Sequence, residues 1–202
     1  MADRGVHVAL GHSDATYEEA LACVNAGADI FVHTYNGMSG LHHREPGMVG
    51  AAMTTHGTYA EAICDGHHLN PIAVRALVNA KGYDHTVLIT DCMRAGGMPN
   101  GQYKLGDFPV VVEGGTARLM DESHSLAGSI LRLFEGVKNV FDWGIVSAEE
   151  AVRMASENPA RSCGIDDVCG FIRPGYDADF IVITKDLQLE ETFLGGKSVY
   201  KA

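Results

Sequence analysis

Hydrophobic positions in the first half of the chain form short runs, and segments with helical periodicity separate these runs. The apolar runs cover residues 6–10, 30–33, 59–64 and 86–90. Apolar residues recur at helical spacing over residues 17–26, 48–56 and 71–81. Such an alternation is typical of strand and helix units around a parallel β-sheet. The pattern therefore predicts four βα units of an α/β fold.

The helix predicted over residues 71–81 carries sequence signals at both of its ends. Asn70 precedes it as an N-cap candidate, and Pro71 occupies the first helical position, where a missing N–H does no harm. Gly82 follows directly and is the residue type that most often ends a helix. We therefore place the bounds of this helix at these residues.

The second half of the chain shows a different pattern. Residues 101–121 predict short β segments broken by Gly and Pro, as in a hairpin excursion. Residues 128–144 and 147–164 have helical spacing. Ser147 and Glu150 match a capping box at the start of the second of these helical segments.

The C-terminal tail returns to a β pattern. Residues 170–202 contain apolar β segments, and the sequence Leu-Gly-Gly at 194–196 predicts a tight turn between two of them. We therefore expect an α/β domain at residues 1–169 and a small β segment at 170–202. Four βα units are too few for a closed (β/α)8 barrel.

Composition and charge narrow the classes of function. The chain has 202 residues, of which 46% are hydrophobic and 20% charged, and this composition suits one sizeable folded core. The formal net charge of −11 repels a polyanion, and no cluster of Lys and Arg offers a path for phosphates. We therefore expect no nucleic-acid partner.

The sequence carries no targeting signal, and its cysteines form no pattern. No apolar run approaches the roughly 20 residues of a membrane span, and the first residues lack the basic and apolar regions of a secretion signal. The five cysteines are scattered and include no C-x-x-C pair, which favours neither a disulfide framework nor a thiolate zinc site. We expect a cytoplasmic protein without a membrane partner.

Polar residues stand where each of the four predicted strands ends. His12, His33 and Asp91 follow three strands, and the segment 65–68 follows the other. The carboxyl ends of parallel strands converge on one mouth, where catalytic groups gather. Imidazole and carboxylate suit a divalent metal, which lowers the pKa of bound water to about 7 for attack on a carbonyl. The pattern predicts a metal-dependent hydrolytic site, into which at most one of the two adjacent histidines of 65–68 points.

A structural role explains each of these residues when it is taken singly. His12 stands beside Ser13 and Thr16, which are ordinary N-cap residues for the following helix. Asp91, after a strand, can simply cap the next turn. Structural roles do not predict titratable groups at four successive strand ends, however, so the constellation favours a functional site.

Two further loops offer groups that can bind a ligand. Asn36, Gly37 and Arg44 belong to a polar loop after the second strand, and the Arg44 guanidinium suits a carboxylate or a phosphate. A solvated loop with an ion pair explains this segment as well. Residues 125–129 precede a helix and present backbone N–H groups that can hold sugar oxygens or an anion. A plain helix start is the alternative for that segment.

The motifs along the whole chain resemble those of the N-acetylglucosamine-6-phosphate deacetylases, a family of the amidohydrolase superfamily. The matching motifs, in chain order, are GHSDAT, VHTYNGM, REPG, CDGHHL, TDCM, LAGS, NPAR and RPGYDADFIVI. Each motif is weak alone, and together they are specific. The resemblance covers the C-terminal half to two-thirds of a family member. It implies the C-terminal part of a (β/α)8 TIM barrel, with about four βα units, followed by a small β-sandwich segment.

The resemblance also implies roles for individual residues. His12 and His33 would be metal ligands, and Asp91 the acid/base that takes a proton from the metal-bound water and returns it to the leaving amine. The residues implied in substrate binding are Asn36, Gly37, Arg44, His68, Leu126, Ala127 and Gly128. The implied reaction is hydrolysis of the acetamide of N-acetylglucosamine 6-phosphate to glucosamine 6-phosphate and acetate.

A divalent metal and a homodimer follow from the same resemblance. Zinc is the first expectation for the metal, with iron or another metal left open, and the loop of Arg44 would reach the neighbouring subunit's site. In the family, a glutamate from an earlier strand completes the metal site, in a part of the sequence that precedes the segment matched here. The chain either retains the deacetylase activity or is a non-catalytic fragment that keeps at most metal or sugar-phosphate binding. A third reading changes the substrate to another acylated amino sugar or a cyclic amide.

Overall fold

The computed structural model describes residues 1–202 and contains a four-stranded parallel sheet. Its strands are β1 (Ala9–Leu10), β2 (Ile30–Phe31), β3 (Tyr59–Ile63) and β4 (Thr86–Ile89), paired in that order. The connecting helices are α1 (Tyr17–Asn25), α2 (Gly47–Thr54) and α3 (Pro71–Lys81), and short 3-10 helices lie at Ala2–Arg4 and Tyr83–His85. The prediction of an α/β fold with four parallel strands is confirmed.

Helix starts follow the capping signals of the sequence. The Asn70 side chain accepts a hydrogen bond from the N–H of Ile72 at 2.9 Å, with Pro71 at the first helical position. Thr16 Oγ1 accepts from the N–H of Glu19 at 3.2 Å, and the Glu19 carboxylate accepts from the N–H of Thr16 at 2.9 Å. These bonds satisfy N–H groups that lack a partner within the helix. The predicted N-cap of α3 is confirmed.

The first strand is shorter than the hydrophobic pattern predicts. Only Ala9–Leu10 pair as β1, whereas the apolar run begins at residue 6. The carboxylate of Asp29 accepts the N–H of Val8 at 3.0 Å and lies 2.5 Å from Nδ1 of His7. Because this side chain captures the backbone donor, the segment before Ala9 does not pair as a strand. The expectation of a strand from residue 6 is wrong for this reason.

Three further helices lie in the second half of the chain. They are α4 (Leu133–Asp142), α5 (Ala148–Ala155) and α6 (Glu157–Ser162). The capping box of Ser147 and Glu150 is confirmed at the start of α5. The predicted helix over 147–164 breaks at Ser156, where φ is −131° and ψ is −68°. Pro159 explains the break, because proline lacks an N–H and its ring clashes with the carbonyl four residues earlier.

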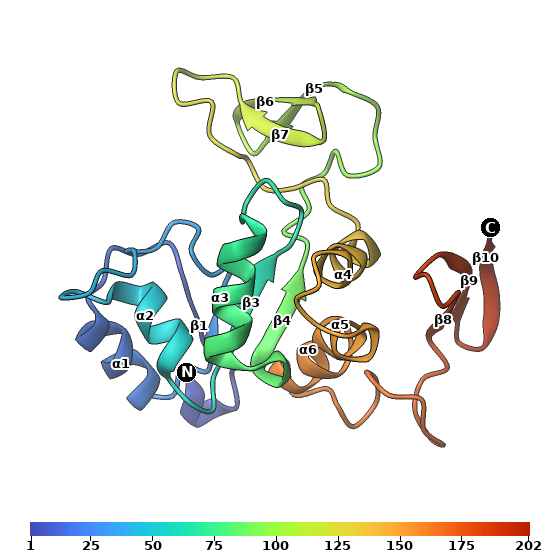
Figure 1. Ribbon diagram of the computed structural model, residues 1–202, viewed down its shortest axis with the longest axis horizontal. Coiled ribbons are helices and arrows are strands. Elements are labelled where there is room, and N and C mark those ends of the chain that lie inside the picture. Colours follow the sequence, from blue (N-terminus) through green and yellow to red (C-terminus); the bar gives the residue numbers. More distant parts are fainter.

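The main core lies between the parallel sheet and the helices α3, α4 and α5. Ala60 and Ala62 of β3 face this core together with Leu77 of α3 and Met154 of α5, and all four are fully buried. Figure 1 shows α3 running alongside β3 and β4, with α4, α5 and α6 on the other side of β4. Because side chains alternate along a strand, Glu61 faces the opposite side of the sheet from this core.

An antiparallel sheet is inserted between β4 and α4. Its strands are β5 (Gly101–Leu105), β6 (Phe108–Glu113) and β7 (Thr116–Leu119), paired in that order. Val110, Val112 and Ala117 build a small core of its own, which also contains Met93 and Ala127. Figure 1 shows the sheet as a separate layer that the chain enters from the carboxyl end of β4. The predicted β excursion is confirmed.

The C-terminal segment forms a third sheet. Its antiparallel strands are β8 (Phe180–Ile183), β9 (Leu189–Leu194) and β10 (Lys197–Lys201), in the order β10-β9-β8. Gly195 and Gly196 have φ values of 55° and 73°, as the tight turn of this hairpin requires. Leu187 is 2% exposed and packs in the main core. The division at residue 170 stays a prediction. No helix has the length and apolar character that crossing a membrane requires.

The Lys81 amine is expected to make the stability of this fold depend on pH. Burial lowers its pKa to about 8, and its Nζ donates to the Thr55 carbonyl and to Thr58 Oγ1, each at 2.6 Å. The unfolded chain keeps this proton up to the ordinary pKa of 10.5. Above pH 8 the unfolded state therefore binds more protons, and the contribution of Lys81 to stability rises with pH.

Urea unfolding of the wild type and of Lys81→Met at pH 7, 8 and 9 checks this sign. We expect the difference in unfolding free energy to move in favour of the wild type as the pH rises. The difference isolates Lys81 because other groups titrate in both proteins, including Cys64, whose pKa burial raises to about 12. A difference that stays constant across this range would contradict the expectation.

Candidate functional site

The four parallel strands end at one edge of the sheet, where the backbone is strained. His12, His33 and Asp91 have φ values of 46°, 28° and 46°. Residues other than glycine rarely adopt positive φ, and such strain gathers at ligand-binding and catalytic sites. All three residues are those that end a strand in the sequence pattern. The geometry therefore marks this edge as the candidate site.

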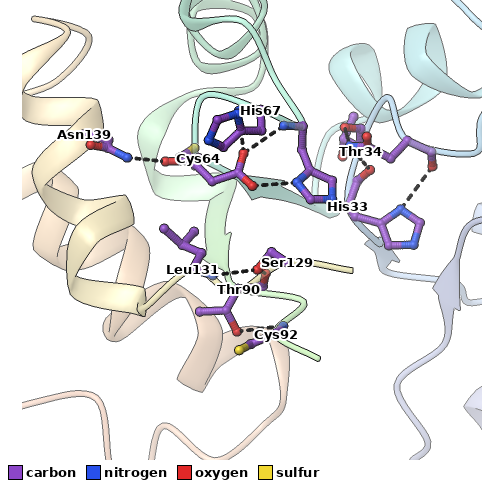
Figure 2. Close-up of polar contacts among 12 residues, drawn as sticks. His33, Thr34, Cys64, His67, Thr90, Cys92, Ser129, Leu131 and Asn139 are labelled. Carbon is purple, nitrogen blue, oxygen red and sulfur yellow. Dashed lines mark hydrogen bonds and ion pairs between the residues drawn. The ribbon is translucent and has the colours of Figure 1, made fainter. Parts of the chain in front are cut away.

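His12 and His33 come together at this edge. Their ring centroids lie 4.6 Å apart, with an angle of 80° between the ring planes. Nδ1 of His33 lies 3.0 Å from the carbonyl oxygen of Asn36. Because a carbonyl can only accept, the proton of the neutral ring lies on Nδ1, and Nε2 keeps its lone pair. Figure 2 shows His33 beside Thr34 and the Nδ1 hydrogen bond of its ring.

The turn at Asn36 and Gly37 supports both histidines. The Asn36 amide donates to the carbonyl of His33 at 3.2 Å. Gly37 has a φ of 61°, and a Cβ placed there would lie 2.8 Å from Nδ1 of His12. A side chain at Gly37 would therefore displace the His12 ring. The structure thus brings two of the predicted substrate-binding residues directly against the two predicted metal ligands.

The side chains at this edge are suitable for part of a divalent metal site. Two imidazole rings in contact are suitable ligands for such a metal. The hydroxyl of Thr34, beside His33, is buried and has no hydrogen-bond partner, so an unmet polar atom lies at the site. The chain contains no group of three or more His, Cys, Asp or Glu side chains that could hold a metal. The edge therefore presents two imidazole rings as its clustered donors.

The two adjacent histidines after β3 differ in their surroundings. Nδ1 of His68 lies 2.6 Å from Oδ2 of Asp65, and both side chains are buried. The His67 side chain is exposed and makes no ring hydrogen bond. Although burial on its own raises the pKa of Asp65, the hydrogen bonds from His68 and from the backbone of His67 hold that pKa below its ordinary value.

Asp91 lies beside the segment that holds Leu126, Ala127 and Gly128. The N–H of Ser129 donates to the carbonyl of Asp91 at 2.8 Å, and a Cβ on Gly128 would lie 3.0 Å from the same oxygen. The Ser129 hydroxyl also donates to the carbonyl of Thr90, as Figure 2 shows. The segment 126–129 therefore runs along the end of β4. The Asp91 side chain is exposed.

Arg44 lies apart from these groups within the chain. It belongs to the exposed loop before α2, and its guanidinium Nη1 lies 2.6 Å from Nε2 of His43. The Arg44 side chain forms no ion pair with an acidic residue of the chain. The ion pair considered from the sequence is therefore absent.

Glu61 joins the site, although the sequence pattern did not single it out. Its Oε2 accepts the N–H of His33 at 3.4 Å. Burial raises the pKa of the Glu61 carboxyl, the hydrogen bond and charge of His33 lower it, and the negative charge of Asp91 raises it. The carboxyl therefore lies within electrostatic reach of both residues. A single acidic residue in an otherwise apolar strand is the signal that could have identified it.

Comparisons with known proteins find similar sequences along nearly the whole chain. The amidohydrolase family model matches residues 1–199. The N-acetylglucosamine-6-phosphate deacetylase of Vibrio furnissii is 46% identical over 198 residues, which are 98% of this chain and 49% of that protein. The N-acetylgalactosamine-6-phosphate deacetylase of Escherichia coli O157:H7 is 43% identical over 194 residues, which are 96% of this chain and 51% of that protein.

A solved structure shows the same fold. The crystal structure of N-acetylglucosamine-6-phosphate deacetylase from Thermotoga maritima superposes with a TM-score of 0.92 at 35% sequence identity. The match covers 100% of this chain and 55% of that chain. The chain therefore spans about half the length of the relatives that it matches.

Proposed function

The chain belongs to the amidohydrolase family, and we propose that it serves the hydrolysis of the acetamide of N-acetylglucosamine 6-phosphate to glucosamine 6-phosphate and acetate. The observation that carries the proposal is the contact between the rings of His12 and His33 at the sheet edge. Asp91, which follows β4, lies at the same edge. Relatives named for the gluco and the galacto sugar are 46% and 43% identical, so the assay includes both epimers.

We further infer the architecture in which this site works. The four parallel strands are the C-terminal part of a (β/α)8 barrel, the segment 170–202 belongs to a small β-sandwich, and the enzyme is a homodimer. The unbroken order β1-β2-β3-β4, with all neighbours parallel, supports the barrel. The exposed loop of Arg44 supports the dimer, because its guanidinium has no acidic partner within the chain.

The residues at the sheet edge divide the chemistry between them. Nε2 of His33 and the ring of His12 would hold a divalent metal, zinc in the first place. The chemistry that such a metal supplies when bound is polarisation of the acetamide carbonyl and acidification of water. The Asp91 carboxylate takes a proton from the attacking water and returns it to the leaving nitrogen. A C–O bond forms, the C–N bond breaks, and acetate and the free amine leave.

The remaining site residues would hold the sugar phosphate. Asn36 and Arg44 are donors suited to phosphate and hydroxyl oxygens, and Nε2 of His68 would accept from a sugar hydroxyl. The backbone of Gly37 and of the segment 126–128 would hold the sugar ring from two sides. The assignment is supported by Asn36 and Gly37 after β2, by His68 after β3 and by the segment 126–128 along the end of β4.

A second candidate function is binding without catalysis. The observation that favours it is the metal site, to which this chain brings two imidazoles and no third clustered ligand. Structural zinc sites have four protein ligands and catalytic ones three. In this reading the chain is a module that holds metal or sugar phosphate.

An assay of acetate release separates the two candidates. The chain with added zinc is given N-acetylglucosamine 6-phosphate, its galacto epimer and unphosphorylated N-acetylglucosamine, and calorimetry measures binding of glucosamine 6-phosphate. Turnover that requires the phosphate supports the enzyme. Product binding without turnover supports the module. The absence of both rejects the two candidates together.

Removing either histidine is expected to weaken metal binding. Titration with Co²⁺, followed by its visible absorption, should show binding to the wild type and a roughly 100-fold loss of affinity in His12→Ala and in His33→Ala. His56→Ala is the matched control, because His56 is exposed and lies outside the site. Equal affinity in all four proteins would contradict the assignment of both ligands.

A further inference from the structure

Asp65 holds the His68 ring through a local set of hydrogen bonds. Its Oδ1 accepts the backbone N–H groups of His67 and His68, each at 2.8 Å, and its Oδ2 lies 2.6 Å from Nδ1 of the His68 ring. One carboxylate oxygen thus binds the backbone, and the other binds the imidazole ring. We propose that Asp65 is a positioning residue, which fixes the ring proton of His68 on Nδ1 and so reserves Nε2 for the ligand.

Burial makes this pair a fixed element of the site. The side chains of His68 and Asp65 are 6% and 10% exposed. Nε2 of His68 makes no hydrogen bond, and it is absent from the buried polar atoms that lack a partner. The small part of the ring that still meets solvent therefore includes Nε2. The ring is anchored on one side and open to a ligand on the other.

A hydrogen bond from α4 and a glycine turn shape the backbone around Asp65. Asn139 of α4 donates its amide N–H to the carbonyl of Cys64 at 2.8 Å, as Figure 2 shows. Gly66 has a φ of 77°, which lets the chain turn back over the carboxylate. The Asn139 hydrogen bond holds the end of β3 independently of the His68 ring. A change in the ring interaction alone therefore leaves the loop in place.

The chemistry of the partner determines which nitrogen carries the proton. An ionised carboxylate only accepts hydrogen bonds, so Nδ1 of His68 carries a proton whether the ring is neutral or charged. The hydrogen bonds that hold the pKa of Asp65 low keep this carboxylate ionised. Of the two adjacent histidines, only His68 has such a partner, which explains why this one serves the ligand. The role of the ligand in this inference rests on the proposed function.

Asp65→Asn separates the two tasks of the carboxylate. The amide oxygen can replace Oδ1 toward the backbone N–H groups, while the amide NH₂ then faces Nδ1 of His68 and only donates. The loop is kept, and the proton of the neutral ring is forced to Nε2. Asp121→Asn is the matched control, because the Asp121 carboxylate accepts from the N–H and hydroxyl of Ser123 in an exposed turn and makes no hydrogen bond with a histidine ring.

The measurement is ¹⁵N NMR of the histidine rings in the free chain, with His68→Gln used to assign the signal. We expect Nδ1 of His68 to be protonated in the wild type and in Asp121→Asn, and the neutral ring to carry its proton on Nε2 in Asp65→Asn. We also expect Asp65→Asn to bind glucosamine 6-phosphate about tenfold more weakly. The same ring tautomer in Asp65→Asn and the wild type would overturn the proposal, whatever the affinity. If the wild type binds no glucosamine 6-phosphate, the proposed function fails, and the NMR signals still decide the role of Asp65.

Discussion

Replacing Asp91 by asparagine is expected to lower the rate of acetate release by roughly 10²–10⁴-fold. The amide of asparagine has the shape of the carboxylate but cannot take a proton from water or return it to the leaving nitrogen. Asparagine tolerates the positive φ of 46° at this position as well as aspartate does. The backbone contact with Ser129 is kept, because it uses the carbonyl of residue 91. The loss should therefore appear in kcat, with the fold unchanged.

Asp107→Asn is the matched control for this prediction. Asp107 is exposed in the turn between β5 and β6, and its substitution removes one negative charge without touching the sheet edge. Rates of acetate release are compared at saturating substrate and zinc, with thermal unfolding measured for each protein. An Asp91→Asn rate within a few-fold of the wild type would remove Asp91 from the role of acid and base. An equal loss in Asp107→Asn would point to net charge instead.

Replacing Asn158 by alanine is expected to destabilise the fold by about 2–4 kcal/mol. The Asn158 side chain is 2% exposed, and its amide donates to the carbonyls of Tyr83 and Thr86, each at 2.7 Å. These bonds tie α6 to the beginning of β4. Alanine leaves both carbonyls without this donor in a site closed to water, and the cost of each lost partner is about 1–3 kcal/mol.

Urea unfolding at constant pH measures this effect, and Asn139→Ala is its control. Asn139 makes one such bond, to the carbonyl of Cys64, and is only partly buried, so its loss should cost about 1 kcal/mol. Asn158 acts where β4 begins, whereas His12 and His33 lie at the edge where the parallel strands end, so the folded Asn158→Ala protein should keep its affinity for metal. A loss of stability no greater than that of Asn139→Ala would contradict the two-bond account.

The candidate site could be located from the sequence but not assembled from it. His12, His33 and Asp91 are recognisable because each ends an apolar run, and parallel strands end at one edge. Glu61 escaped this reasoning because it lies within a strand, and only the turn of His33 toward it makes it part of the site. The contacts of Arg44 depend on where a long loop folds, and no local pattern decides that.

The fold shows the same division. Helix starts at Thr16, Asn70 and Ser147 follow from side chains within three residues of the N–H groups that they cap. The late start of β1, after Val8, depends instead on Asp29, which is 21 residues away from Val8 in the chain. Pro159, which accounts for the break before α6, is a local signal of the same kind as the helix caps.

The sequence by itself determined the helix caps, the glycine turns and the polar residues that close each strand, because these features depend on close neighbours in the chain. The tertiary structure decided that His33 presents Nε2, that His68 rather than His67 is anchored by Asp65, and that the segment 126–129 lies along Asp91. These facts depend on which acceptor meets which donor in space. Periodicity places a residue on a strand or a helix, and only packing determines which atom of its side chain remains free for a ligand.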